Sequence, residues 1–95
     1  MLTGYTASPE VINKLTWVVV NHDPRILYVH DLKAFHFGND YLVEVDIVLS
    51  EDMQIKDSHD LGETLSIKLE RIPGIERVYV HMDYDFSYIH HLTRV

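Results

Sequence analysis

The stretch Arg77–Asp85 alternates between polar and apolar side chains, and this alternation constrains the fold more than any other feature of the 95-residue chain. Successive side chains of a β-strand point to opposite faces of a sheet. The apolar positions, which suit a hydrophobic core, are Val78, Val80 and Met82. The opposite face would carry His81 and Asp83. The pattern therefore predicts a half-buried strand that holds an imidazole and a carboxylate side by side.

The rest of the chain predicts two helices and two further strands. Ser8 and Pro9 give an N-cap and a proline at the first helical position. Gly38-Asn39-Asp40 favours a hairpin turn between two strand-forming segments. The predicted elements are a helix over 9–22, strands over 26–37 and 41–49, a helix over 54–71 and a strand over 75–83. A β-bulge is expected within residues 31–34, where alternation would otherwise turn Lys33 inward.

The second helix should bury one apolar stripe, formed by Ile55, Leu61, Leu65, Leu69 and Ile72. Gly62 also lies on this stripe. Glycine in a helix interior costs about 1 kcal/mol relative to alanine, so it is expected to permit close approach to a strand or a partner. We divide the chain into a flexible lead-in (1–7), one folded domain (8–85) and a tail (86–95).

Composition narrows the class of function. The net charge of −7 and only 8 scattered Lys and Arg argue against nucleic-acid binding and suit a cation. The absence of cysteine excludes disulfides, thiolate zinc sites and thiol nucleophiles. No enzyme constellation is found, so we do not expect catalysis. The longest apolar run, residues 17–20, predicts no membrane insertion by this piece.

Seven histidines accompany the 15 acidic residues, and five side chains are candidate ligands for a divalent metal ion. The alternation places His30, Asp46, His81 and Asp83 on one sheet face, and His59 approaches from the start of the second helix. Imidazole with carboxylate suits Zn²⁺, Mn²⁺, Co²⁺ or Fe²⁺. The alternative is that these are solvated polar residues on the open face of a metal-independent dimerisation or docking module.

Four motifs resemble the C-terminal cytoplasmic domain of cation diffusion facilitators (metal tolerance proteins), and their order and spacing cover residues 9–85. The motifs are Val29-His30-Asp31-Leu32, the hairpin 37–47 that ends in Val45-Asp46-Ile47, Ser58-His59-Asp60-Leu61-Gly62-Glu63 and Val78-Tyr79-Val80-His81-Met82-Asp83. The resemblance implies an α+β, ferredoxin-like αββαβ two-layer sandwich. It also implies a homodimer that continues from a transmembrane domain, at the cytoplasmic face of an intracellular membrane of vacuolar or Golgi type.

The same resemblance implies a regulatory metal site near the dimer interface, with ligands at the positions of His30, Asp46, His59, His81 and Asp83. Zinc-type members often have histidine where this chain has Asp46, and residues 38–53 look like the manganese-type branch of plants and fungi. An oxygen ligand in place of nitrogen reduces the bias toward Zn²⁺ and is compatible with Mn²⁺. The expected function is a domain that senses cytosolic metal for a divalent-cation transporter.

Overall fold

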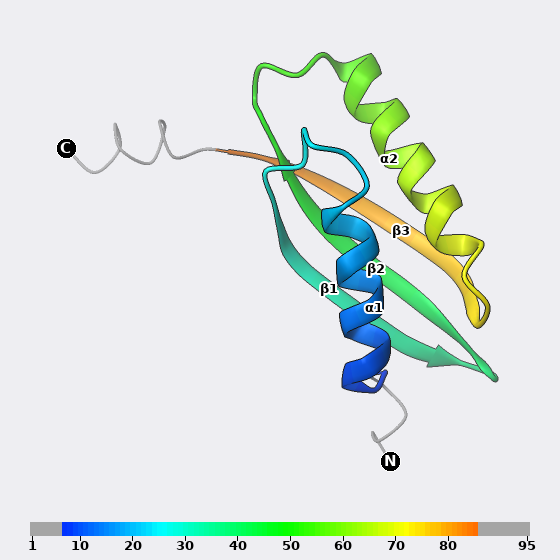
Figure 1. Cartoon of the computed structure of the whole chain (residues 1–95). Coiled ribbons are helices and arrows are strands. Elements are labelled where there is room, and N and C mark those ends of the chain that lie inside the picture. The colour runs from blue at the N-terminus through cyan, green and yellow to red at the C-terminus, as the bar shows by residue number, and fades with distance from the viewer. Residues whose placement is uncertain (1–6, 86–95) are drawn as a thin grey trace.

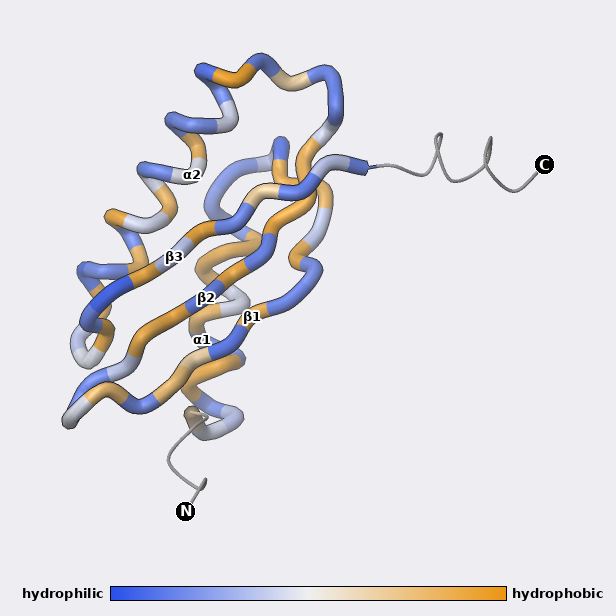
Figure 2. Tube along the Cα trace, turned by 180° about the vertical axis from the view of Figure 1, so that it is seen from behind, coloured by the Kyte–Doolittle hydropathy of each residue, from blue (hydrophilic) through white to orange (hydrophobic). Residues whose placement is uncertain are grey.

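The computed structural model describes residues 7–85, which form two layers, a three-stranded sheet and two helices that lie on one of its faces (Figure 1). The elements are α1 (Pro9–Val20), β1 (Tyr28–Phe37), β2 (Asp40–Leu49), α2 (Ile55–Glu70) and β3 (Ile75–Tyr84). The predicted order and the α+β, ferredoxin-like arrangement are confirmed. Seen from behind, no helix among residues 7–85 lies over the second face of the sheet (Figure 2).

β2 is the central strand of the sheet. It pairs antiparallel with β1 and parallel with β3. The hairpin explains the first pairing, and the α2 crossover explains the second, because parallel neighbours need a long connection. Val43 and Val45 of β2 are fully buried against the helices. Their partners in the sheet, including Ala34 and Val78, complete the strand side of one hydrophobic core.

The helix ends follow from local chemistry. The Ser8 hydroxyl accepts a hydrogen bond from the Val11 N–H at 3.4 Å, so Ser8 is the predicted N-cap of α1. Ala7, outside the predicted domain boundary, is buried, and its N–H donates to the Ala34 carbonyl at 2.9 Å. The remaining predicted lead-in and the predicted tail lie outside the described residues.

The bulge lies earlier in β1 than the sequence predicts. The pairing register shifts between Val29 and Asp31, which makes His30 the extra residue. Lys33 needs no bulge of its own because it pairs with Glu44 on the uncovered face and is exposed. The bulge shifts the alternation of β1, so Asp31 and Lys33, which pair with Asp46 and Glu44, both face the uncovered side.

α2 packs closely on β3 at Gly62, as the sequence predicts. A Cβ added there would lie 3.2 Å from the Met82 sulfur and 3.3 Å from its methyl carbon. The stripe is buried at Leu61, Leu65 and Leu69. Ile55 was wrongly predicted to join it and is 82% exposed, because it occupies the first residue of the helix, beyond the buried turns.

His22 connects the two helices. Its Nε2 lies 3.1 Å from the Thr64 hydroxyl on α2. Burial and the nearby Lys68 ammonium lower the pKa of His22 below its ordinary value, against opposing effects of the Leu61 backbone and Asp23. The folded state therefore favours the neutral ring.

The close approach at Gly62 predicts a steep dependence on side-chain size. Gly62→Ala should change the free energy of unfolding by less than about 1 kcal/mol, because gained helix propensity offsets displacement of the flexible Met82 end. Gly62→Leu should cost about 1–3 kcal/mol, since Met82 and Val80 must both move. Urea unfolding measures both. Glu63→Leu, at the neighbouring exposed position, is the control, and equal stability of the two leucine variants would contradict the packing.

His22 predicts a pH dependence. Because its pKa is lower in the folded chain than the unfolded value of about 6.5, its contribution is fully present above that pH. It is lost as the pH falls through the folded pKa. Between pH 7.5 and 5.5, the free energy of unfolding should fall further in the natural chain than in His22→Gln. Thr64→Val, which removes the hydrogen-bond partner but keeps the imidazole, is the control and should retain a pH effect. Identical dependence of the free energy of unfolding on pH in the natural chain and in His22→Gln would refute the assignment.

Candidate metal site

The uncovered face of the sheet brings Asp46 and His81 together. They are direct partners in the parallel ladder between β2 and β3, and paired residues project to the same face. Neighbouring strands lie about 4.8 Å apart. Asp46 is partly buried at the centre of the sheet, whereas His81 is exposed at its edge. The predicted pairing of a carboxylate with an imidazole is therefore present in the register of the strands.

Asp83 lies one step further along the same face. Its partner on β2 is Val48, which is only 3% exposed even though it lies on the face without helices. Tyr28 flanks Val48 on the β1 side. The exposed Asp83 carboxylate thus borders an apolar position of the uncovered face.

His30 lies in the β1 bulge, next to the residue that pairs with Asp46. That residue is Asp31, which was absent from the predicted ligands. Asp31, Asp46 and His81 form one row across all three strands. The Lys33 ammonium lies 3.5 Å from the Asp31 carboxylate, and both side chains are about half exposed, so this ion pair is weak. The only sequence signal for Asp31 as a candidate ligand is its position directly after His30. The bulge decides which face of the sheet the Asp31 side chain is on.

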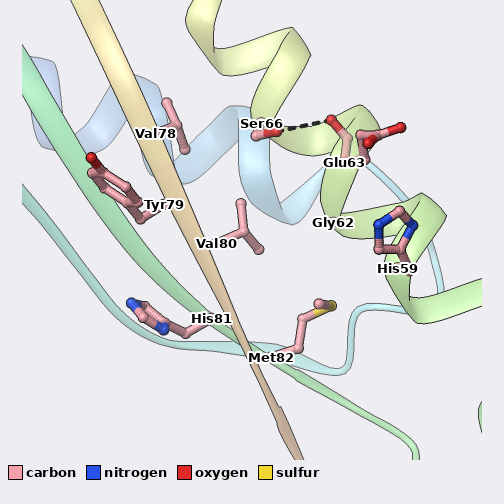
Figure 3. A pocket seen from close by; sticks show the side chains of 9 residues that line it. All are labelled: His59, Gly62, Glu63, Ser66, Val78, Tyr79, Val80, His81 and Met82. Atoms are coloured by element: carbon pink, nitrogen blue, oxygen red, sulfur yellow. Dashed lines mark hydrogen bonds between the residues drawn. The ribbon is translucent and has the colours of Figure 1, made fainter. Parts of the chain in front are cut away.

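His59 lies on the helix side of β3, apart from the other four residues. It borders an open groove of about 370 Å³ along the outer edge of the sheet. Figure 3 shows His59 on α2 and His81 projecting from the opposite side of the strand. The groove is lined by His59, Gly62, Glu63, Ser66, Val78, Tyr79, Val80, His81 and Met82.

The described part of a single chain gathers no group of three or more His, Cys, Asp or Glu side chains able to hold a metal ion. Asp46, His81 and Asp83 share the uncovered face, His30 lies in the bulge beside it, and His59 lies across the strand. A complete set of five ligands from one chain would need His59 to pass around β3. The described part of one chain therefore does not bring all five predicted residues together.

The surroundings of His59 suit a metal ligand. Its Nδ1 lies 3.5 Å from the Asp60 carboxylate, which also accepts from the Lys56 ammonium at 3.1 Å. Lys56 and then His59 lower the pKa of Asp60, so the carboxylate is ionised. A carboxylate on one ring nitrogen orients an imidazole and leaves the other nitrogen as an acceptor. The His59 side chain is 69% exposed, so its ring is accessible from outside the chain.

Comparison with known proteins identifies the family. Residues 7–85 match the family model ZT_dimer, described as the cytoplasmic domain of cation efflux proteins. The chain belongs to this family. Neither helix of the described part is long and apolar enough to cross a membrane.

Among curated relatives of this cation efflux domain are metal tolerance proteins of plants. The chain is 47% identical over 87 residues to metal tolerance protein 5 of Oryza sativa subsp. japonica, and 44% identical over the same length to metal tolerance protein 10 of Arabidopsis thaliana. Each match covers 92% of this chain but only 21% and 20% of the relative. The chain thus spans about one fifth of these proteins.

Solved structures confirm the fold. A structure of CzrB, named as a proposed zinc transporter, has a TM-score of 0.77 at 25% identity, covering 83% of this chain and 98% of that one. A cadmium form of a MamM CTD variant has a TM-score of 0.74 at 20% identity, covering 81% and 96%. The arrangement of β1, β2, β3 and both helices is shared with C-terminal domains of this family.

Proposed function

We propose that this chain is the regulatory and dimerisation domain of a divalent-cation transporter and that it binds cytosolic metal on the uncovered face of its sheet. The observation that carries the proposal is the direct pairing of Asp46 with His81, with Asp83 two residues further along β3. Two carboxylates and an imidazole on rigid strands are oriented before an ion arrives, which lowers the entropic cost of binding. The cation efflux family supports a metal ion as the ligand.

A second copy of the chain completes the proposed site. One protomer offers His30, Asp46, His81 and Asp83 on its sheet, while its exposed His59 lies on the other side of β3. In a homodimer, the His59 of one protomer would reach the sheet face of its partner. A two-fold dimer repeats each contact, so two equivalent sites would form. Metal binding would then draw the protomers together.

Mn²⁺ is the proposed physiological ion. The sheet contributes carboxylates at Asp46 and Asp83, and the newly found Asp31 adds a third oxygen donor close by. Carboxylate-rich sets suit Mn²⁺, whereas thiolate or imidazole-rich sets favour Zn²⁺. We place the domain at the cytoplasmic face of an intracellular membrane, vacuolar or Golgi-like, joined to a transmembrane domain and without catalytic activity.

The alternative function is a dimerisation or docking module whose histidines and aspartates bind no metal. It is favoured by the incomplete ligand group in the described part of one chain and by the exposure of His30, His81 and Asp83. Under this alternative, the alternation of side chains along the strands places polar residues on the uncovered face because that face contacts water.

Metal titration separates the two functions. The double variant His81→Ala plus Asp83→Ala removes two proposed ligands. Its affinity for Mn²⁺ and Zn²⁺ should fall by more than about 100-fold, because losing only a residue that hydrogen-bonds to a ligand already costs up to about 100-fold. Isothermal titration calorimetry measures the change. His36→Ala changes a histidine outside the proposed set, whose ring packs at a tilt of 38° against Tyr41, and should bind as the natural chain does. Equal heats for the natural chain and the double variant would leave only the metal-independent module.

Mixing two variants tests whether the site is shared between protomers. His59→Ala alone and His81→Ala plus Asp83→Ala alone should each lack complete sites. Random re-pairing after mixing makes about half the dimers mixed, and each mixed dimer holds one complete site of two. The mixture should therefore recover about a quarter of the natural high-affinity capacity by calorimetry. No recovery from a mixture shown to exchange subunits would contradict a shared site.

A further inference from the structure

A second groove, of about 480 Å³, lies at the end of the sheet where β2 and β3 finish. One wall is formed by Arg25 and Leu27, between α1 and β1. The other is formed by Asp52 and Met53, between β2 and α2, and by Asp57 in the first turn of α2. Figure 1 shows these connections and the end of β3 at the same end of the sheet. None of the five proposed metal ligands lines this groove.

The groove contains exposed apolar surface. Leu27, in one wall, is 50% exposed, and Met53, in the other, is partly exposed. Exposed apolar groups gathered at one concave surface indicate a contact with another segment or molecule. Burial of such groups stabilises a contact by roughly 25 cal/mol per Å².

The groove has acidic walls. Residues 51–57 contain Glu51, Asp52 and Asp57 against one lysine. The positive charge of Arg25 does little to neutralise these carboxylates, because its guanidinium is already paired with Asp23. Arg25 donates two hydrogen bonds to that carboxylate, from Nε at 3.0 Å and from Nη2 at 2.9 Å. The same contact lowers the pKa of Asp23 to about 2, so the pair stays charged. A fitting occupant is therefore apolar and carries positive charge.

The described part of the chain ends beside this groove. The Asp85 N–H donates to the Leu49 carbonyl at 3.0 Å, and the Leu27 N–H donates to the Val48 carbonyl at 2.8 Å, on the other edge of β2. Asp85 and Leu27 are thus about two strand spacings, or roughly 10 Å, apart. Ten further residues follow Asp85 in the sequence. Extended, such a segment spans up to about 33 Å, so it can cross the groove.

The segment 86–95 has the chemistry that the groove fits. Its apolar residues are Phe86, Tyr88, Ile89, Leu92 and Val95, and it contains Arg94 and the His90-His91 pair but no acidic residue. We propose that residues 86–95 dock in the groove between Leu27, Met53 and Asp57 of their own chain. Because the segment is tethered beside its site, its effective concentration is high, and weak contacts are sufficient to hold it.

A spin label on the segment tests the docking. The chain contains no cysteine, so Thr93→Cys gives one unique attachment site, distant along the chain from Asp85. In the full 95-residue chain, a nitroxide at this position should broaden the amide signals of Leu27, Met53 and Asp57. The amides of Gly38 and Gly74, in the turns at the opposite end of the sheet, should stay sharp. Sharp signals at Leu27, Met53 and Asp57 would overturn the proposal.

Two controls make the result specific. A mixture of isotope-labelled natural chain with spin-labelled chain of natural isotope abundance should show no broadening, and broadening there would assign the groove to a second copy instead. Leu27→Asp should abolish the broadening. Phe37→Asp, at a similarly exposed apolar residue in the opposite end of β1, should retain it. Broadening that survives Leu27→Asp, in a chain whose amide spectrum remains native, would also overturn the proposal.

Discussion

The pairing of β2 with strands on both sides is the constraint on which the rest of the structure depends. Val43, Val45 and Ile47 are fully buried on one face of β2, while Asp46 lies between Asp31 and His81 on the other. A slip of one residue would expose all three apolar side chains and bury the carboxylate. Each exposed side chain would cost about 1.5–3 kcal/mol. The hydrophobic core therefore holds the proposed metal ligands in register.

Much of this arrangement can be predicted from the sequence because it depends on how apolar and polar residues alternate over short stretches of the chain. Alternation in β2 and β3 assigns Val45 and Val80 to the core and Asp46 and His81 to the open face. Ser8 before α1, Pro9 at its first position, and the glycine turns set the element ends. These signals act within a few residues, so they can be read without knowing the tertiary structure.

Other features depend on contacts that no local period contains. The bulge at His30 changes which side Asp31 faces, and its position is decided by how β1 meets β2. The side of β3 on which His59 lies depends on how α2 rests on the sheet, which the close contact of Gly62 with Met82 determines. Asp83 lies on the uncovered face and only two residues before Asp85, the last described residue, whose N–H donates to the Leu49 carbonyl at the end of the sheet where the second groove lies. An ion bound to Asp83 and a segment docked after Asp85 would therefore act on the same strand end.

A domain of this size buries only about 60–65% of the surface of its unfolded chain, so burial against a second copy would add stability. The most direct test of the proposed site is anomalous scattering from crystals of the chain grown with Mn²⁺. The account predicts an anomalous peak at the uncovered face, bound by Asp46, His81 and Asp83 together with the partner subunit's His59. Peaks only at crystal contacts or at other side chains, with the sheet face bound to water, would contradict it.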